Sequence, residues 1–171
     1  MLDKKITDSY IFKDGEPQYI SRISKCGSRG ILLNKKKQVA LMYMKKRDMY
    51  KLPGGGIEEG ETKEQAFERE VKEETGYHCH IISFLGKIEE HKLRRDYLHI
   101  SYCFLAEAIG KKGPLHLTQN ERHYDFRLQW FDIDEAIVMM EKSIAKCGRY
   151  GLLFVLNRDK EILEFYREEI L

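Results

Sequence analysis

The sequence predicts an α/β protein in which helices pack on both sides of a mixed β-sheet. Alternating apolar residues over 97–106, and two apolar segments at 29–33 and 39–44, predict strands of that sheet. Apolar residues that recur every three or four positions between 133 and 144 predict an amphipathic helix. A chain of this length suits a single domain with its own hydrophobic core, so we expect one domain over residues 1–171.

The first 24 residues are expected to form a short N-terminal extension of this domain. Its aromatic segments, 10–12 and 19–20, are candidate edge strands around a turn at Asp14-Gly15. The extension has no apolar stretch typical of a signal peptide, and no part of the chain approaches a membrane span. We therefore expect no membrane partner.

The expected core, residues 25–135, begins with a hairpin. Its strands, 29–33 and 39–44, flank the lysine-rich segment 34–38, which we interpret as a solvated hairpin tip. Residues 50–52 then lead into a glycine turn. Because glycines have no side chain, the backbone there can turn tightly and approach a ligand closely.

A helix is predicted over residues 63–75, with a signal at each end. Thr62 and Gln65 form a capping box, since the hydroxyl can accept from the Gln65 amide and the Gln65 side chain can reach back. Gly76 follows where a left-handed closing residue is needed. The apolar residues on one face supply a buried stripe: Ala66, Phe67 and Val71.

Further strands are expected after this helix, at 79–88 and 97–106, with the charged segment 91–96 as their connection. A glycine-rich loop at 110–114 then leads toward a final strand at 129–131. The predicted sheet therefore takes its strands from both halves of the core.

The C-terminal part, residues 136–171, is expected to be helical. The first helix there follows the final strand and should close at Gly148. The tail from Tyr150 to Leu171 is again helical in pattern, with a candidate break near Asn157. Its apolar end fits either a packed terminal helix or the surface of a homodimer, and the sequence leaves both open.

Charge and cysteine content exclude several classes of protein. Lys and Arg number 30 against 28 Asp and Glu, a net charge of +2, whereas proteins that coat nucleic acids carry a concentrated basic excess. Stable nucleic-acid binding is therefore not expected. The cysteines form no C-x-x-C pair, so we interpret them as ordinary thiols of a cytoplasmic protein, with neither a disulfide nor a zinc site.

The most informative segment, Gly55–Tyr77, reads GGIEEGETKEQAFEREVKEETGY. On a helix, Glu70, Glu73 and Glu74 would share about 100° of one face. Like charges at that spacing repel one another and weaken an isolated helix. A hard divalent cation resolves the conflict, because Mg²⁺ prefers a few carboxylate oxygens together with water and phosphate oxygens. The segment therefore predicts a metal site.

This segment resembles the Nudix box, G-x5-E-x7-R-E-U-x-E-E-x-G-U, where U is a bulky apolar residue. Its fixed positions are occupied in register by Gly55, Glu61, Arg69, Glu70, Val71, Glu73, Glu74 and Gly76. Tyr77 stands where an aliphatic residue is more usual. A looser resemblance extends over residues 25–135. It implies an α/β/α sandwich that hydrolyses a nucleoside diphosphate linked to another group.

The resemblance also implies a cofactor, Mg²⁺ or Mn²⁺, and residues to hold it. We expect the metal ligands to be Glu70, Glu73 and Glu74, with the Gly55 carbonyl as a further ligand. Glu61 is expected to orient the ligands or to bind a second ion. Helical geometry predicts that Arg69 faces away from the centre of the carboxylates and pairs with Glu61 or another box carboxylate.

The group that takes the proton from the attacking water is open between a box glutamate, Glu70 or Glu73, and an acidic residue in a loop before the final strand. Glu121 lies where such a loop residue is expected. Arg29, just before the first strand, is either a phosphate contact or a surface arginine. Aromatic rings can stack on a base, and Tyr50 is therefore a candidate substrate contact. The flexible Gly54 is another.

Family subgroups carry markers outside the box, and those of the ADP-ribose, dinucleoside polyphosphate, NADH and coenzyme A types are absent here. A MutT-like nucleoside triphosphate pyrophosphatase, which releases a nucleoside monophosphate and pyrophosphate, is therefore the leading expectation. The alternatives are an ADP-ribose or nucleotide-sugar pyrophosphatase and a nucleotide-sensing module without catalysis. An RNA-end-processing enzyme would share the chemistry but would need a basic groove.

Overall fold

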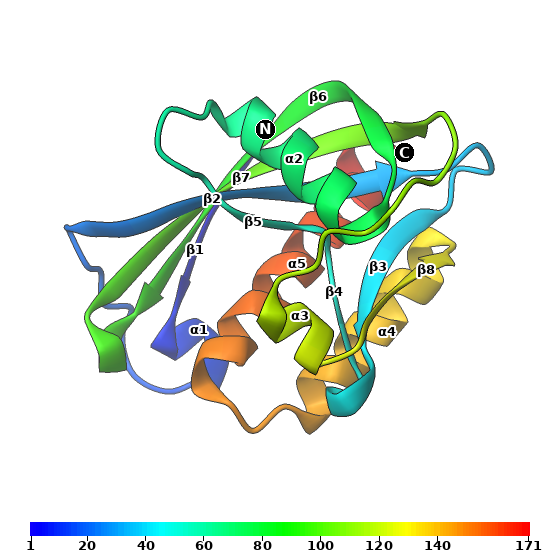
Figure 1. The fold of residues 1–171 in the computed structure, drawn as a ribbon. Helices are drawn as coiled ribbons and strands as arrows, with labels where there is room; N and C mark the ends of the chain where they lie inside the picture. The colour runs from blue at the N-terminus through cyan, green and yellow to red at the C-terminus, as the bar shows by residue number, and fades with distance from the viewer.

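The computed structural model describes all 171 residues and contains one sheet of eight strands. The main order across the sheet is β1-β6-β7-β2-β3-β4, with β5 paired to β2 and β8 paired to β3. β1 runs parallel to β6 and β2 parallel to β7, while the other pairs are antiparallel, so the sheet is mixed (Figure 1). The strands are β1 (Leu2–Thr7), β2 (Ile23–Leu33), β3 (Val39–Met44), β4 (Met49–Lys51), β5 (Gly54–Gly56), β6 (His78–Lys92), β7 (Tyr97–Ile109) and β8 (Phe126–Phe131).

Helices cover both faces of the sheet, which confirms the predicted sandwich (Figure 1). On one face, Phe67 and Val71 of α2 pack against Leu32 and Phe104 in the smaller of two cores. On the other face, α4 and α5 enclose the larger core. None of the helices combines the length and the hydrophobicity that crossing a membrane requires. The helices of the structure are α1 (Asp8–Phe12), α2 (Lys63–Thr75), α3 (Gln119–His123), α4 (Ile133–Lys146) and α5 (Tyr150–Glu169). Single 3-10 turns lie at Lys45–Arg47 and Leu93–Arg95.

The N-terminal segment differs from its prediction. Residues 2–7 form a strand that pairs with β6, and Leu2 and Ile6 are buried in the larger core. The candidate edge strand at 10–12 is wrong, because Thr7 ends β1 and its hydroxyl accepts a hydrogen bond from the Tyr10 amide at 3.3 Å, which caps the short helix α1. The candidate strand at 19–20 has no regular structure.

Several strands extend beyond their predicted ends. β2 begins at Ile23, six residues before the expected start, and β6 continues through Lys92 into the segment 91–96 that was expected to connect two strands. β6 is longer because its antiparallel pairing with β7 continues until Lys92 faces Tyr97, and β2 is longer because its parallel pairing with β7 begins at Ile23. Residues of the charged segment therefore lie within the sheet, and Glu90 and His91 are buried.

The C-terminal helices also correct two expectations. α4 ends at Lys146 and its following residue, Cys147, is extended, so Gly148 does not close the helix. α5 continues through Asn157 without a break, since the Asn157 side chain donates to the Leu153 carbonyl at 2.8 Å and stays within the helical turn.

Candidate active site

Helix α2 spans the predicted residues, and both capping interactions are present. Thr62 Oγ1 accepts from the Gln65 amide at 3.1 Å, and Gln65 Oε1 accepts from the Thr62 amide at 2.9 Å. Gly76 closes the helix in the left-handed conformation with φ of 79°. Phe67 and Val71 are fully buried against the sheet. Because they hold α2 in place, the adjacent face of this helix lies against the glycine turn.

The glycine turn, β5, brings its backbone directly against this surface. Gly54 has φ of 138°, a backbone conformation that residues other than glycine rarely adopt. A Cβ atom on Gly55 would lie 2.3 Å from Oε1 of Glu70. Only glycine at this position therefore leaves room for the Glu70 carboxylate beside the turn.

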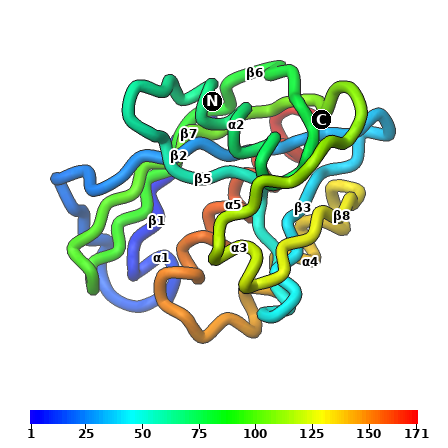
Figure 2. The backbone as a smooth tube through the Cα atoms, in the orientation of Figure 1, coloured from blue at the N-terminus to red at the C-terminus, as the bar shows by residue number.

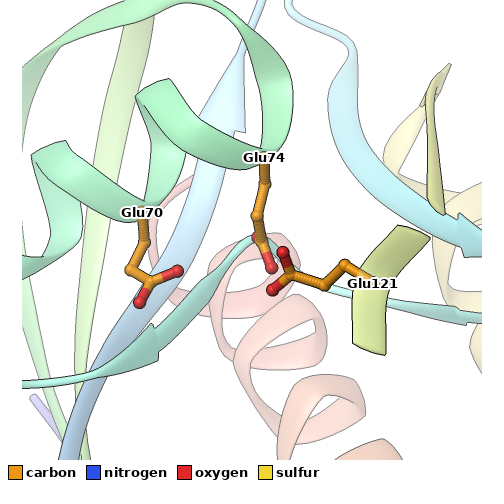
Figure 3. A group of neighbouring side chains, drawn as sticks. All are labelled: Glu70, Glu74 and Glu121. Atoms are coloured by element: carbon orange, nitrogen blue, oxygen red, sulfur yellow. The ribbon is translucent and has the colours of Figure 1, made fainter. Parts of the chain in front are cut away.

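Three carboxylates from two helices meet beside the turn (Figure 3). Glu70 and Glu74 come from successive turns of α2, and Glu121 reaches them from α3. One oxygen from each lies within 4.8 Å of the other two. Converging carboxylate oxygens of this kind fit the oxygen ligands that Mg²⁺ prefers, so these residues could hold a divalent ion.

Glu73 lies outside this group of three. Its carboxylate is partly exposed and accepts from Nη1 of Arg69 at 3.2 Å. The helical face was predicted to align Glu73 with its neighbours, but the arginine holds its carboxylate to one side. Its role as a metal ligand stays a prediction.

Arg69 does not face away from the carboxylates, so that expectation is wrong. Its long side chain folds back along the helix, and Nη1 donates to Glu70 at 2.9 Å while Nη2 donates to the Gly56 carbonyl at 2.9 Å. The expected pairing with Glu61 is confirmed through Nε and Nη2. Hydrogen bonding to Arg69 lowers the pKa of Glu61, and one guanidinium thus orients several acidic side chains.

Glu74 is almost fully buried and has internal donors on both oxygens. Oε1 accepts from Lys51 Nζ at 2.9 Å, and Oε2 accepts from the Gly54 amide at 2.9 Å. Burial raises the pKa of Glu74 to about 7, although Lys51 acts in the opposite direction. Burial likewise raises the pKa of Glu70 against the effect of Arg69. Burial thus disfavours the ionised form of both carboxylates, and a bound divalent ion would favour it.

Lys51 was missed by the sequence reasoning. It is the last residue of β4, and its ammonium group also donates to the Gly54 carbonyl at 3.0 Å. The available signal was its position, three residues before Gly54 at the end of a strand that leads into the turn. Lys51 therefore ties β4, the glycine turn and Glu74 together.

Glu121 lies on a short helix, whereas a loop was expected. Thr118 caps α3, and Glu121 Oε2 accepts from the Thr118 amide at 2.7 Å in return. The same capping-box spacing that identified α2 is present at Thr118-Gln119-Asn120-Glu121 and could have predicted α3. This cap fixes the direction in which Glu121 points.

Arg29 is neither a surface residue nor a residue before the first strand. β2 begins earlier than predicted, so Arg29 lies in its middle, buried, and its Nε donates to Ser101 Oγ at 3.0 Å. Burial lowers the pKa of Arg29. A Cβ atom on Gly27 would lie 2.8 Å from Arg29 Nη2 and 2.7 Å from the Gly55 carbonyl. The guanidinium is therefore close to the underside of the glycine turn, and a substrate contact stays a prediction.

A buried polar network surrounds Arg29 between the sheet and α5. Arg158 of α5 donates to Glu90 Oε2 at 2.9 Å and to Asp159 Oδ1 at 2.8 Å. Asp159 Oδ2 in turn accepts from the Leu52 amide at 2.9 Å, next to the glycine turn. Burial would raise the pKa of Glu90, but Arg158 and Lys92 outweigh it and hold that pKa well below its usual range. This network supports the turn from the opposite side of the sheet.

Tyr50 and Gly54, the other expected substrate contacts, flank Lys51. The Tyr50 hydroxyl donates to Gln129 Oε1 at 3.1 Å, and its ring stacks on Tyr43 with centroids 4.8 Å apart. Gly54 is buried and held by Glu74. Neither residue joins the three carboxylates, and both stay predictions as substrate contacts.

Comparisons with known proteins agree with this geometry. The model of the NUDIX domain family matches residues 27–150. A provisionally named 8-oxo-dGTP diphosphatase of Bacillus subtilis (strain 168) is 34% identical over 139 residues, covering 81% of this chain and 78% of that protein. An RNA pyrophosphohydrolase of Ruthia magnifica subsp. Calyptogena magnifica is 37% identical over 98 residues, which are 54% of each protein.

Among solved structures, a NUDIX hydrolase from Nitrosomonas europaea superposes with a TM-score of 0.59 at 20% identity, covering 79% of this chain and 86% of that one. That similarity shows the fold. A sandwich of this topology with an intact box of glycines, arginine and glutamates defines a hydrolase of acid anhydrides. The chain belongs to the Nudix family.

Proposed function

We propose that this protein is a divalent-metal-dependent pyrophosphohydrolase that acts on a nucleoside triphosphate or a derivative of one. It would release a nucleoside monophosphate and pyrophosphate. The observation that carries the proposal is the convergence of Glu70, Glu74 and Glu121 beside the glycine turn. The similarity to a relative named for 8-oxo-dGTP supports the substrate class.

Glu70, Glu74 and Glu121 would hold Mg²⁺ or Mn²⁺, with the Gly55 carbonyl, Glu73 and Glu61 as further predicted oxygen donors. When bound, a divalent ion neutralises phosphate charge and makes ionisation of water easier. Arg69 fixes Glu61 and Glu70, and it also binds the Gly56 carbonyl, so ligands and turn keep one geometry. Lys51 does the same for Glu74 and Gly54.

We propose that Glu121 accepts the proton of the attacking water. Glu70 and Glu73 are the alternatives for this role. The Glu121 carboxylate faces the α2 carboxylates, and one of its oxygens is fixed by the Thr118 amide. A positioned carboxylate of this kind contributes about 10²–10⁴-fold to a rate by accepting a proton. Glu121→Gln retains the shape of the residue and removes that ability.

An RNA pyrophosphohydrolase is the second candidate, because a relative of that name is similar over 98 residues. The ADP-ribose or nucleotide-sugar alternative has no comparable support. A non-catalytic sensing module would not need converging carboxylates with an arginine and a lysine to orient them. The possible homodimer and the cytoplasmic location stay predictions.

The experiment is a substrate panel with Mg²⁺ or Mn²⁺, in which released phosphate, pyrophosphate and nucleoside monophosphate are measured. The panel contains dGTP, 8-oxo-dGTP, ADP-ribose and a 5′-triphosphorylated RNA. We expect pyrophosphate from the nucleoside triphosphates, at a rate that is about 10²–10⁴-fold lower for Glu70→Gln. Faster turnover of the RNA than of every mononucleotide would favour the second candidate, and no product from any compound would reject both.

A further inference from the structure

A second hollow lies where the turn between β2 and β3 meets the end of β7, away from the carboxylate group. It encloses about 420 Å³, within the range of small-molecule sites. We call it the hairpin pocket, and its walls are Asn34, Lys35, Lys36 and Gln38 from the turn, with Tyr77, Ala108, Gly110 and Trp130. No glutamate of the proposed active site lines it.

One wall of the hairpin pocket is an aromatic corner. Tyr77 follows α2, and Trp130 lies on β8, with ring centroids 6.0 Å apart and planes at 73°. Both rings are half-buried, so each is anchored in the fold and still offers surface to the pocket. Half-buried aromatic rings on a rigid sheet are suitable surfaces for stacking a planar base.

The β2–β3 turn, which also lines the hairpin pocket, is ordered and carries positive charge. Asn34 Oδ1 accepts from the amides of Lys36 and Gln38, at 2.9 and 3.0 Å, which fixes the turn. Lys37 is paired with Glu107, whereas the exposed Lys35 and Lys36 form no ion pair in the structure. A solvated hairpin tip would account for lysines alone, but it would not account for an aromatic corner in the same pocket.

We propose that the hairpin pocket is a second nucleotide-binding site. The base would stack in the corner of Trp130 and Tyr77, and the phosphate would lie against the ammonium groups of Lys35 and Lys36. This inference goes beyond the hydrolytic function and does not depend on it, because it uses none of the carboxylates and no metal.

The backbone runs from the end of β7 past α2 to the short helix α3 (Figure 2). Gly110 lines the pocket and begins a segment that crosses the end of α2 and reaches Glu121. Along this path the Gly113 amide donates to the Gly76 carbonyl at 2.7 Å, and the His116 amide donates to the Glu73 carbonyl at 2.9 Å. The pocket and the three carboxylates therefore lie on opposite ends of one tethered segment.

The test uses the single tryptophan of the chain as its reporter, since Trp130 lies in the pocket. AMP is titrated into the protein in EDTA while tryptophan emission is recorded. We expect a saturable change in the wild type, and AMP affinity about three- to tenfold weaker in the double variant Lys35→Ala/Lys36→Ala. Adenosine, which lacks phosphate, should bind both proteins equally.

Two controls separate this site from the active site and from general charge effects. Lys4→Ala/Lys5→Ala removes the same charge from β1, an edge strand that β6 and β7 separate from β2, and should leave the titration unchanged. Glu70→Gln should also leave it unchanged, whatever it does to hydrolysis. The proposal is overturned by an unresponsive Trp130, by equal effects of the two lysine pairs, by loss of the signal in Glu70→Gln, or by binding of an oligoribonucleotide but not of AMP.

Discussion

Two groups of charged residues lie on opposite sides of the glycine turn, and they balance charge in different ways. Above the turn, two positive side chains, Arg69 and Lys51, lie among five glutamates: Glu61, Glu70, Glu73, Glu74 and Glu121. Below it, Glu90 and Asp159 lie among Arg29, Lys92 and Arg158. The upper group has an excess of negative charge that a bound cation would neutralise. The lower group is nearly neutral without any bound ion.

This difference separates function from stability. Removing one partner of a buried ion pair lowers the free energy of unfolding, because the remaining partner stays charged and unpaired. A crowded set of carboxylates that can take up a cation is instead a site for chemistry. Substitutions in the upper group should therefore act on turnover, and those in the lower group should act on unfolding.

The largest effect is expected from Glu70→Gln in the upper group. We expect kcat to fall about 10²–10⁴-fold, since a carboxylate at the reacting centre is lost. The free energy of unfolding should stay the same or rise, because like-charge repulsion is reduced. Glu68→Gln, on the exposed side of the same helix, is the matched control and should retain full activity. Equal rates in both variants would contradict the assignment.

The lower group should respond in the opposite way. Arg158→Met leaves Glu90 and Asp159 without their shared partner, and we expect a loss of about 3–5 kcal/mol in the free energy of unfolding, measured with urea. Arg167→Met, a more exposed site on the same helix, should change it by less than about 0.5 kcal/mol. Similar midpoints for the two variants would show that the buried pair does not stabilise the fold.

The pH dependence of stability distinguishes the groups further. The pKa of Glu74 is about 7 in the folded state, above its value of 4.5 in a model compound, so the protonated form favours folding. Without metal, its contribution is complete below about pH 4.5 and is lost as the pH rises through 7, by up to about 3 kcal/mol. Glu74→Gln should remove this slope. If wild type and variant lose stability in parallel over this range, the burial effect on Glu74 is absent.

A smaller effect is expected from Arg69→Lys. Lysine retains the charge but cannot bind Glu61, Glu70 and the Gly56 carbonyl together. We expect kcat to fall about 10–100-fold, as for other residues that orient metal ligands. Lys72→Arg on the exposed side of α2 is the control. Full activity of Arg69→Lys would mean that a positive charge at this position is enough for activity, without the several hydrogen bonds of the guanidinium.

The sequence predicted helix α2, which carries most of the upper group, because the signals for this helix are close together in the chain. Caps, spacing and the glycine turn determine α2 locally, and the residues 63–75 and 39–44 were predicted with their observed ends. Glu121 was expected in a loop and lies on α3, because its cap was overlooked, and its role in catalysis stays a prediction. The direction of Arg69 depends on side-chain packing, which spacing alone does not define.

The lower group was not predicted, because it depends on strand register. Glu90 faces His99 and Arg29 faces Cys103 only once β6, β7 and β2 are aligned. Nothing near Arg158 in sequence indicates that its guanidinium meets a carboxylate 68 residues away. Strand β1 was missed for a similar reason, as only its pairing with β6 makes an isolated Leu2 and Ile6 part of the core.

The most direct test of the central claim is metal binding by isothermal titration calorimetry. Wild-type protein should take up Mg²⁺ or Mn²⁺, and Glu68→Gln should bind with the same affinity. Glu70→Gln and Glu121→Gln should bind at least about tenfold more weakly, because each removes one of the converging oxygens. Absence of metal uptake by correctly folded wild type, even with nucleotide present, or unchanged affinity in both variants, would contradict the account.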